Sequence, residues 1–192
     1  MPLVPVFFCI DNYIGTVKLV GGRSMQPTFN KRGKQNNDAV VLDRWSARTL
    51  AYRRGDVVVL RSPNAPDEML TKRVVGLPGD WVRPRAAAHA FENATDSSQL
   101  SAASRDVVHV PRGQLWVEGD NAASSNDSNG FGCVAAALIE ARVWFKLWPL
   151  NEAGIVRRVE PPSSRLVHRG ACEAMAACVS EGKGVQPWHA VR

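Results

Sequence analysis

The sequence lacks the cysteine and histidine patterns that hold metal ions. Its four cysteines contain no CxxC pair, and its four histidines do not complete the spacing of a zinc site. We therefore expect no metal centre. The thiols stand at Cys9, Cys133, Cys172 and Cys178. We interpret them as four unlinked thiols, with a disulfide between Cys172 and Cys178 as the alternative.

A run of about 20 apolar residues, the length of a transmembrane helix, is missing at the start of the chain. The apolar run Met1–Ile10 stops at Asp11, so it is too short to span a bilayer alone. It also has no basic region before it and no small-residue cleavage site, which a secretory signal needs. We therefore predict that residues 1–16 are a membrane-proximal segment. This segment either packs on the domain or is the end of a longer anchor.

A concentrated basic segment is missing as well, although the chain carries a formal net charge of +6. The 24 Lys and Arg residues are scattered, and no stretch resembles a basic arm or a recognition helix. We interpret the charge as a generally basic surface and expect no nucleic acid among the partners.

The composition is that of a folded chain rich in turns. Its 192 residues correspond to one domain and a modest excess. With 45% hydrophobic and 22% charged residues, it has the apolar content for a core. The 15 Gly and 12 Pro residues favour many turns and short elements, and therefore a mainly β fold.

Short runs rich in β-branched residues, bounded by Gly or Pro, predict the strands. They are Val17–Val20, Ala39–Asp43, Asp56–Arg61, Met69–Val75, Trp81–Arg85, Val107–Val110, Gln114–Glu118 and Arg142–Trp148. We predict a surface loop over Ala86–Arg105 and a helical turn or two over Val134–Ala141. The domain then covers residues 17–150, and residues 151–192 form a weakly structured tail.

Two residues in these segments have the chemistry for nucleophilic catalysis. Ser24 follows a predicted strand, and Pro27 prevents an immediate helix, so the hydroxyl of Ser24 can be exposed in a turn. The alternative is a loop serine that is only solvated or caps a helix. In the strand Met69–Val75, period-two alternation places Lys72 and Val74 on one face. A buried lysine has a lowered pKa, and its neutral amine can act as a general base. The alternative is a strand-edge lysine whose amine reaches water.

A third segment, Glu118–Gly132, combines Gly, Asp, Asn and Ser at a density that indicates a hydrogen-bonded turn system. One alternative is a plain polar loop. Another is a calcium site made by Asp120, Asn126 and Asp127, although their spacing fits no EF-hand.

In this order, the segments resemble the four sequence motifs of the type I signal peptidases, which are serine proteases with a Ser/Lys dyad. The motifs are SMQPT at Ser24–Thr28, RRGDVVVL at Arg53–Leu60, KRVVGLPGD at Lys72–Asp80 and EGDNxxxSxDSN at Glu118–Asn129. The resemblance covers about residues 1–150. It implies a signal-peptidase-like β-sheet domain and a reaction that needs no cofactor.

The resemblance also implies roles for individual residues. Ser24 would be the nucleophile and Lys72 the general base. In relatives, the serine aligned with Ser125 orients the lysine, and the aspartate aligned with Asp127 supports that loop through a charged partner. Asn129 stands where relatives usually have an arginine. We therefore expect the neighbouring cation of the lysine, Arg73, to be the substitute partner of the aspartate.

Further roles follow from the same resemblance. Asp120 is interpreted as a turn former that supports the site, and the backbone N–H of Ser24 as the first donor to the oxyanion. Substrate side chains before the cleavage site are expected to be small. The residues of their pocket would be Val20, Gly22, Met25 and Leu70.

Within the family, the chain most resembles the mitochondrial members. The features are SMQP, DSN followed by FG up to Gly132, LWP at Leu147–Pro149, and the lack of a large second domain. They imply an enzyme of the mitochondrial inner membrane that faces the intermembrane space and removes sorting signals from precursor polypeptides. Its partner would be a homologous catalytic subunit in a heterodimer. The alternatives are a non-catalytic stabilising subunit and a self-cleaving repressor-type Ser/Lys protease, although we find no helix-turn-helix for the latter.

Overall fold

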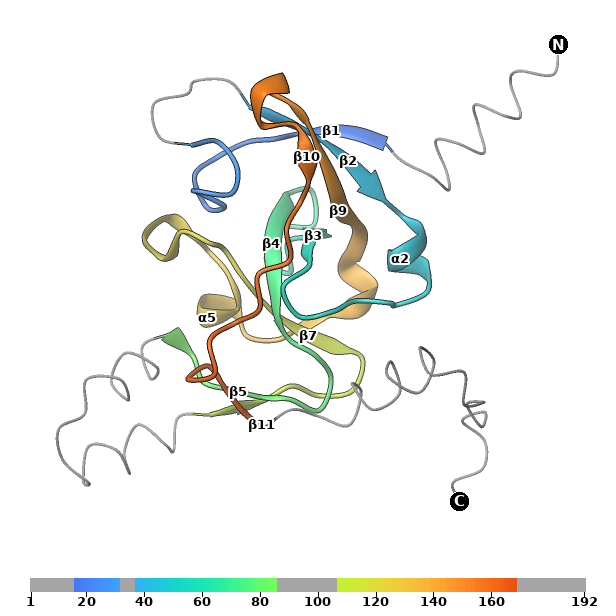
Figure 1. The fold of residues 1–192 in the computed structure, drawn as a ribbon. Helices are drawn as coiled ribbons and strands as arrows, with labels where there is room; N and C mark the ends of the chain where they lie inside the picture. Colours follow the sequence, from blue (N-terminus) through green and yellow to red (C-terminus); the bar gives the residue numbers. More distant parts are fainter. Residues whose placement is uncertain (1–15, 32–36, 86–106, 169–192) are drawn as a thin grey trace, which may run out of the picture.

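The computed structural model describes residues 16–31, 37–85 and 107–168. Within these ranges the protein is mainly β, as predicted. An antiparallel sheet has the strand order β1-β2-β9-β3-β4-β7-β8, with β10 paired to β9, and a three-stranded sheet has the order β11-β5-β6 (Figure 1). The strands are β1 (Thr16–Val20), β2 (Asp38–Asp43), β3 (Val57–Arg61), β4 (Met69–Gly76), β5 (Trp81–Val82), β6 (Val108–His109), β7 (Gln114–Glu118), β8 (Val134–Ala135), β9 (Ile139–Trp148), β10 (Gly154–Ile155) and β11 (Leu166–His168).

Short helical turns connect some of the strands. They are α2 (Trp45–Arg48), α5 (Ser128–Phe131) and the 3-10 turns η2 (Ala122–Ser124), η3 (Ala136–Leu138) and η4 (Leu150–Glu152). Helix α5 begins after Asp127, whose side chain accepts a hydrogen bond from the backbone N–H of Asn129 and so caps the helix. A residue predicted to support the active site therefore also fixes the start of a helix.

The structure confirms the strands predicted up to Glu118, with β5 and β6 shorter than expected, and moves the start of the closing strand. The helical prediction for Val134–Ala141 holds only for the turn η3, because β8 precedes this turn and β9 already begins at Ile139. An alanine-rich segment favours a helix locally. Here Val134 pairs with Leu115 and is 1% exposed, so its place in the sheet decides its conformation.

The strands at the centre of the main sheet are buried on both faces. In β3, Val58 packs in one apolar cluster and Val57 in another, as period-two alternation requires. A third cluster, which contains Val75 and Trp116, packs beside the three-stranded sheet. Strand β4 pairs with β3 over Met69–Arg73, and Lys72, which lies in this paired part, is buried.

The segment after β9 returns across the sheet instead of extending as a tail. In Figure 1 it crosses the face of the molecule from β10 at the top to β11 at the bottom. Between these strands Arg158 forms an ion pair with Asp56 at 2.9 Å. The carbonyl oxygen of Val159 lies so close to Gly55 that a Cβ on this glycine would be 2.6 Å from it. Part of the predicted tail, up to residue 168, therefore packs on the domain.

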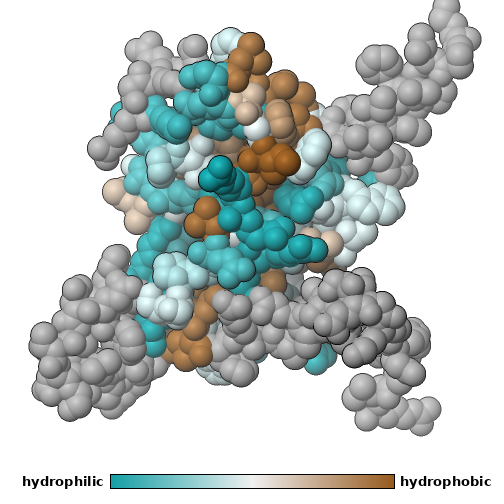
Figure 2. Space-filling view, viewed as in Figure 1, coloured by the Kyte–Doolittle hydropathy of each residue, from teal (hydrophilic) through white to brown (hydrophobic). Residues whose placement is uncertain are grey.

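Apolar side chains are exposed around the end of β9. Figure 2 shows hydrophobic atoms at the top of the molecule, over η4 and β10. Leu150 and Ile155 are 71% and 68% exposed, respectively. In the part of the chain that the structure describes, no helix is long and apolar enough to cross a membrane.

Some of the sequence predictions fall outside the described residues. These are the membrane-proximal segment except for Thr16, the loop over Ala86–Arg105, the tail after His168 and the Cys172–Cys178 disulfide. Cys133 lies within the described ranges and is a free, half-buried thiol, and burial raises the pKa of this thiol.

Candidate active site

Ser24 lies in a loop that is closed on itself directly after β1. Met25 and Phe29 in this loop are buried, with 2% and 1% of their surface exposed, and anchor the loop in the core. The side-chain amide of Asn30 donates a hydrogen bond to the carbonyl of Val20 at 2.8 Å, which joins the two ends of the loop. Ser24 itself is half-buried in a turn of this loop, after the strand, as the sequence predicts.

Three hydrogen bonds connect this loop to the segment after β7, and one of them runs from Nδ2 of Asn121 to the carbonyl of Arg23 at 3.2 Å. Thr28 donates from Oγ1 to Oδ2 of Asp120 at 2.5 Å, although the two residues are 92 positions apart in the sequence. The backbone N–H of Asn121 donates to the carbonyl of Ser24 at 2.9 Å. The structure thus brings together the first and the last of the motifs found in the sequence.

Lys72 lies in the middle of β4 and is 2% exposed. Val74, on the same face of the strand, packs in the core cluster that also contains Val58. The Nζ atom of Lys72 donates a hydrogen bond to Oγ of Ser125 at 3.2 Å, and this hydroxyl is the partner of the amine among the described residues. The alternative of an edge lysine that reaches water is therefore wrong.

The surroundings of Lys72 favour its neutral form. Burial lowers the pKa of the amine below its usual value of 10.5. The negative charges of Asp127 and Glu68 act in the opposite direction, and the positive charge of Arg85 adds to the lowering. Because burial is the largest contribution, a larger fraction of Lys72 is neutral at physiological pH than of an exposed lysine.

Ser125 and Asp127 hold the amine in place, as the resemblance implies. The hydroxyl of Ser125 donates to Oδ2 of Asp127 at 2.6 Å, which leaves its lone pairs for the hydrogen bond from Lys72. The same carboxylate oxygen accepts the backbone N–H of Gly119 at 2.9 Å. Burial raises the pKa of Asp127, but hydrogen bonds from Ser125, Asn129 and Gly119 outweigh it, and the pKa lies below 3.8. This carboxyl group is therefore ionised at neutral pH.

Gly119 is the position at which these parts of the site approach one another. A Cβ on this residue would lie 2.5 Å from the carbonyl oxygen of Ser24 and 2.8 Å from Cβ of Ser125. The backbone of the Ser24 loop and the partner of Lys72 are therefore in contact across a residue without a side chain. This close approach explains why a glycine stands in the EGD sequence.

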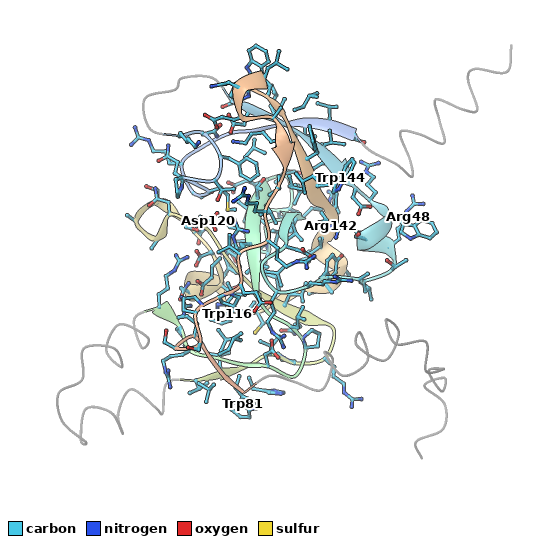
Figure 3. The ribbon with its side chains drawn as sticks, viewed as in Figure 1. Arg48, Trp81, Trp116, Asp120, Arg142 and Trp144 are labelled. Carbon is cyan, nitrogen blue, oxygen red and sulfur yellow. The ribbon has the colours of Figure 1, made fainter. Side chains whose placement is uncertain are left out.

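Arg73 is not the partner of Asp127, so this expectation is wrong. Its guanidinium forms a bidentate ion pair with Asp120, at 2.7 Å to each oxygen, and donates to the carbonyl of Gly55 at 2.7 Å. The reason is the alternation of β4, which turns Arg73 away from the face that carries Lys72. Figure 3 shows Asp120 between β4 and the loop after β7, where it binds Arg73 and Thr28 in addition to shaping the turn.

The cation beside Asp127 is Arg85, which sequence analysis does not find. Its Nη1 atom lies 3.3 Å from Oδ2 of Asp127, and its Nη2 atom donates to the carbonyl of Gly119. Because 42 residues separate Arg85 from Asp127, no local pattern connects them. The calcium alternative is not supported. Asp120 and Asp127 form ion pairs with two different arginines, so their carboxylates do not converge on one cation site.

The residues predicted for the substrate pocket lie in different surroundings. Val20 and Met25 are buried in one core cluster, with 4% and 2% of their surface exposed. Leu70 packs against another cluster, and Gly22 is exposed at the surface of the loop. A pocket lined by all four residues remains a prediction.

Comparisons with known proteins show the family to which the chain is similar. Residues 1–148 match the family model described as signal peptidase, peptidase S26. A mitochondrial inner membrane protease subunit 2 from Mus musculus is 38% identical, over 83% of this chain and 82% of the relative. Another, from Schizosaccharomyces pombe, is 40% identical over 79% of this chain and 74% of the relative.

The chain is also similar to the other subunit of that protease and to a bacterial structure. Mitochondrial inner membrane protease subunit 1 from Homo sapiens is 34% identical, over 78% of this chain and 79% of the relative. A crystal structure of a signal peptidase I from Enterococcus faecalis is 27% identical with a TM-score of 0.33, and covers 47% of this chain and 94% of that chain.

Proposed function

Since the chain belongs to the signal peptidase family, peptidase S26, and is a serine peptidase of that type, we propose that Ser24 is its nucleophile and Lys72 its general base. The observation that carries this proposal is the burial of Lys72, which is 2% exposed. Its amine is held by Ser125 and has a lowered pKa, as a lysine base requires.

In the proposed reaction, neutral Lys72 accepts the hydroxyl proton of Ser24 while Oγ attacks the carbonyl carbon of the scissile bond. The Lys72 ammonium then gives this proton to the leaving amine, so that the C–N bond breaks and an ester remains on Ser24. A water molecule transfers a proton to Lys72 as it attacks the ester. The ammonium finally returns the proton to Oγ of Ser24, which restores the starting state.

The names of the relatives support a location, and the description of the family, signal peptidase, supports a substrate class. Both relatives at 38% and 40% identity are mitochondrial inner membrane proteases, and we propose the same membrane for this chain. We further propose that the domain faces the intermembrane space and removes sorting signals from precursor polypeptides. Since relatives of both subunit types match, we propose that it works with a homologous catalytic subunit.

The test is cleavage of an intermembrane-space precursor by the chain reconstituted with the homologous subunit. We expect Ser24→Ala and Lys72→Ala each to lower the rate by at least about 1000-fold, the scale for loss of a nucleophile or base. The matched controls are Ser124→Ala and Lys31→Ala. Ser124 is exposed in η2, and Lys31 is 54% exposed in an ion pair with Glu152. The controls are expected to cleave at the wild-type rate.

The result also separates the proposal from its alternative. Loss of cleavage in both dyad variants, with circular dichroism unchanged, supports catalysis by this chain. Cleavage that persists in Ser24→Ala would show that the partner performs the chemistry and that this chain is a non-catalytic, stabilising subunit.

A further inference from the structure

Asp127 is a buried carboxylate one hydroxyl away from the amine of Lys72. With 2% of its surface exposed, its charge is poorly screened by water. Without a positive partner, such a carboxylate favours the ammonium form of a neighbouring lysine and costs free energy through its own desolvation. The sequence offers no cation two positions later, because residue 129 is the uncharged Asn129.

Arg85 occupies the place of this missing cation. Its guanidinium touches three groups of the site: Oδ2 of Asp127 at 3.3 Å, Oε2 of Glu118 at 3.1 Å, and the carbonyl of Gly119. Only 20% of its side-chain surface is exposed. Glu118 also forms an ion pair with Arg165 and accepts a hydrogen bond from the indole N–H of Trp116. These contacts fix Glu118, and Glu118 in turn helps to fix Arg85.

We infer, on the basis of the proposed Ser24/Lys72 reaction, that Arg85 is a positioning residue that compensates the charge of Asp127, keeps Ser125 aligned with Lys72, and so maintains the amine as a base.

The side chain of Asn129 fits this arrangement in a way that an arginine would not. Its Nδ2 atom donates to Oδ1 of Asp127 at 2.8 Å, and its Oδ1 atom accepts the backbone N–H of Arg85 at 2.8 Å. An arginine side chain has no acceptor, so it could not receive this N–H. Asn129 therefore connects the carboxylate to the backbone of the residue that supplies its counter-charge.

The charges around Lys72 determine the direction of the effect on pH dependence. Asp127 and Glu68 favour the ammonium, whereas burial and Arg85 disfavour it. Removal of the Arg85 charge leaves Asp127 and Glu68 less opposed, so the pKa of Lys72 rises. A smaller fraction of the base is then neutral at pH 7, and the acidic limb of the pH profile moves to higher pH.

The first test measures kcat/KM against pH with the full chain reconstituted with the homologous subunit. We expect Arg85→Gln to lower kcat/KM at pH 7 by about 10- to 100-fold, by analogy with the residues that orient metal ligands, and to move the acidic limb to higher pH. Arg85→Lys keeps the charge and should retain the position of the limb.

The matched control is Arg61→Gln. Arg61 forms an ion pair with Glu140 at 2.7 Å and is 55% exposed at the end of β3. It should change neither the rate nor the pH profile. An acidic limb that stays in place in folded Arg85→Gln would overturn the inference.

A second measurement does not depend on activity. The ¹³C shift of Cε in Lys72, assigned by its loss in Lys72→Ala, reports the titration of the amine directly. We expect Arg85→Gln to move this titration to higher pH and Arg61→Gln to leave it unchanged; an unchanged titration in Arg85→Gln overturns the inference. If wild type and Ser24→Ala cleave equally well, the proposed function fails, while this titration still tests the role of Arg85.

Discussion

Gly119 leaves no room for a side chain between the Ser24 loop and Ser125. We expect Gly119→Ala to lower kcat/KM by at least about 10-fold, because a shift of about 1 Å at a reacting group costs up to about 100-fold. The methyl group would lie 2.5 Å from the carbonyl oxygen of Ser24, and a backbone atom cannot yield as a flexible side chain does. The measurement is cleavage kinetics together with thermal unfolding.

Gly154→Ala is the control for this substitution. Gly154 lies in β10, and a Cβ there would meet nothing within 4 Å. Its rate should equal that of wild type. Equal rates for Gly119→Ala and wild type would show that the Ser24 loop can move away from Gly119 without changing the position of Ser24. The close approach at Gly119 would then not be needed for activity.

At the residue scale, local rules predict which face of a strand a side chain occupies. They do not predict ion-pair partners that only the tertiary structure brings together. Alternation places Lys72 and Arg73 on opposite faces of β4, and the structure confirms it. The partner of Asp127 could not be predicted in the same way. Arg85 reaches it through the tertiary structure, and Arg73, which the sequence suggests because it is adjacent to Lys72, pairs with Asp120 instead.

At the element scale, the segment between β10 and β11 depends on a glycine in the turn before β3. Gly55 has φ +85°, and a Cβ would lie 2.6 Å from the carbonyl oxygen of Val159. We expect Gly55→Ala to destabilise the fold by about 2 kcal/mol or more, since a left-handed backbone alone costs about 1–2 kcal/mol for a residue with a side chain. Urea unfolding and proteolysis after β9 measure the effect.

Arg158→Ala is a milder change to the same contact. Its ion pair with Asp56 is 38% exposed on the arginine side, so its loss should cost less than about 1 kcal/mol. If Arg158→Ala destabilises the protein more than Gly55→Ala does, the segment is held by charge rather than by close backbone packing, and the interpretation of Gly55 is wrong.

The elements that sequence patterns miss are the shortest ones. Strands β10 and β11 contain two and three residues, too few to show alternation, and they flank a weakly patterned stretch around Pro161 and Pro162. Their pairing with β9 and β5 is a property of the completed sheets. The apolar run of β3, in contrast, is evident from the sequence alone, because both faces of this strand are buried.

At the scale of the whole molecule, buried acidic groups limit the pH range of the fold from both sides. Hydrogen bonds hold the pKa of Asp127 below 3.8 despite its burial, so its contribution to stability is present above this value and is lost as the pH falls through its folded pKa. Tyr52 acts at the other end. Burial raises its pKa from 10.0 to about 12, so its contribution is present below pH 10 and is lost as the pH rises to 12.

Tyr52→Phe isolates the alkaline effect. At pH 7 we expect wild type to be more stable by about 1 kcal/mol, because the hydroxyl donates to the carbonyl of Ala47 at 3.2 Å. Between pH 10 and 12 the tyrosine of the unfolded chain ionises while that of the fold stays protonated. Wild type then loses stability that the variant keeps. The free energies of unfolding from urea titrations should therefore converge above pH 10 and then cross.

The comparison is internally controlled, because both proteins share every other titrating group, including Lys72 and Cys133. Their contributions cancel in the difference between the two unfolding free energies, and what remains reports the surroundings of one hydroxyl. A difference that stays constant from pH 7 to the alkaline range would mean that this hydroxyl is solvated in the fold. Since Tyr52 is 8% exposed and its hydroxyl bonds to a residue of α2, such a result would contradict the packing of α2 against the core.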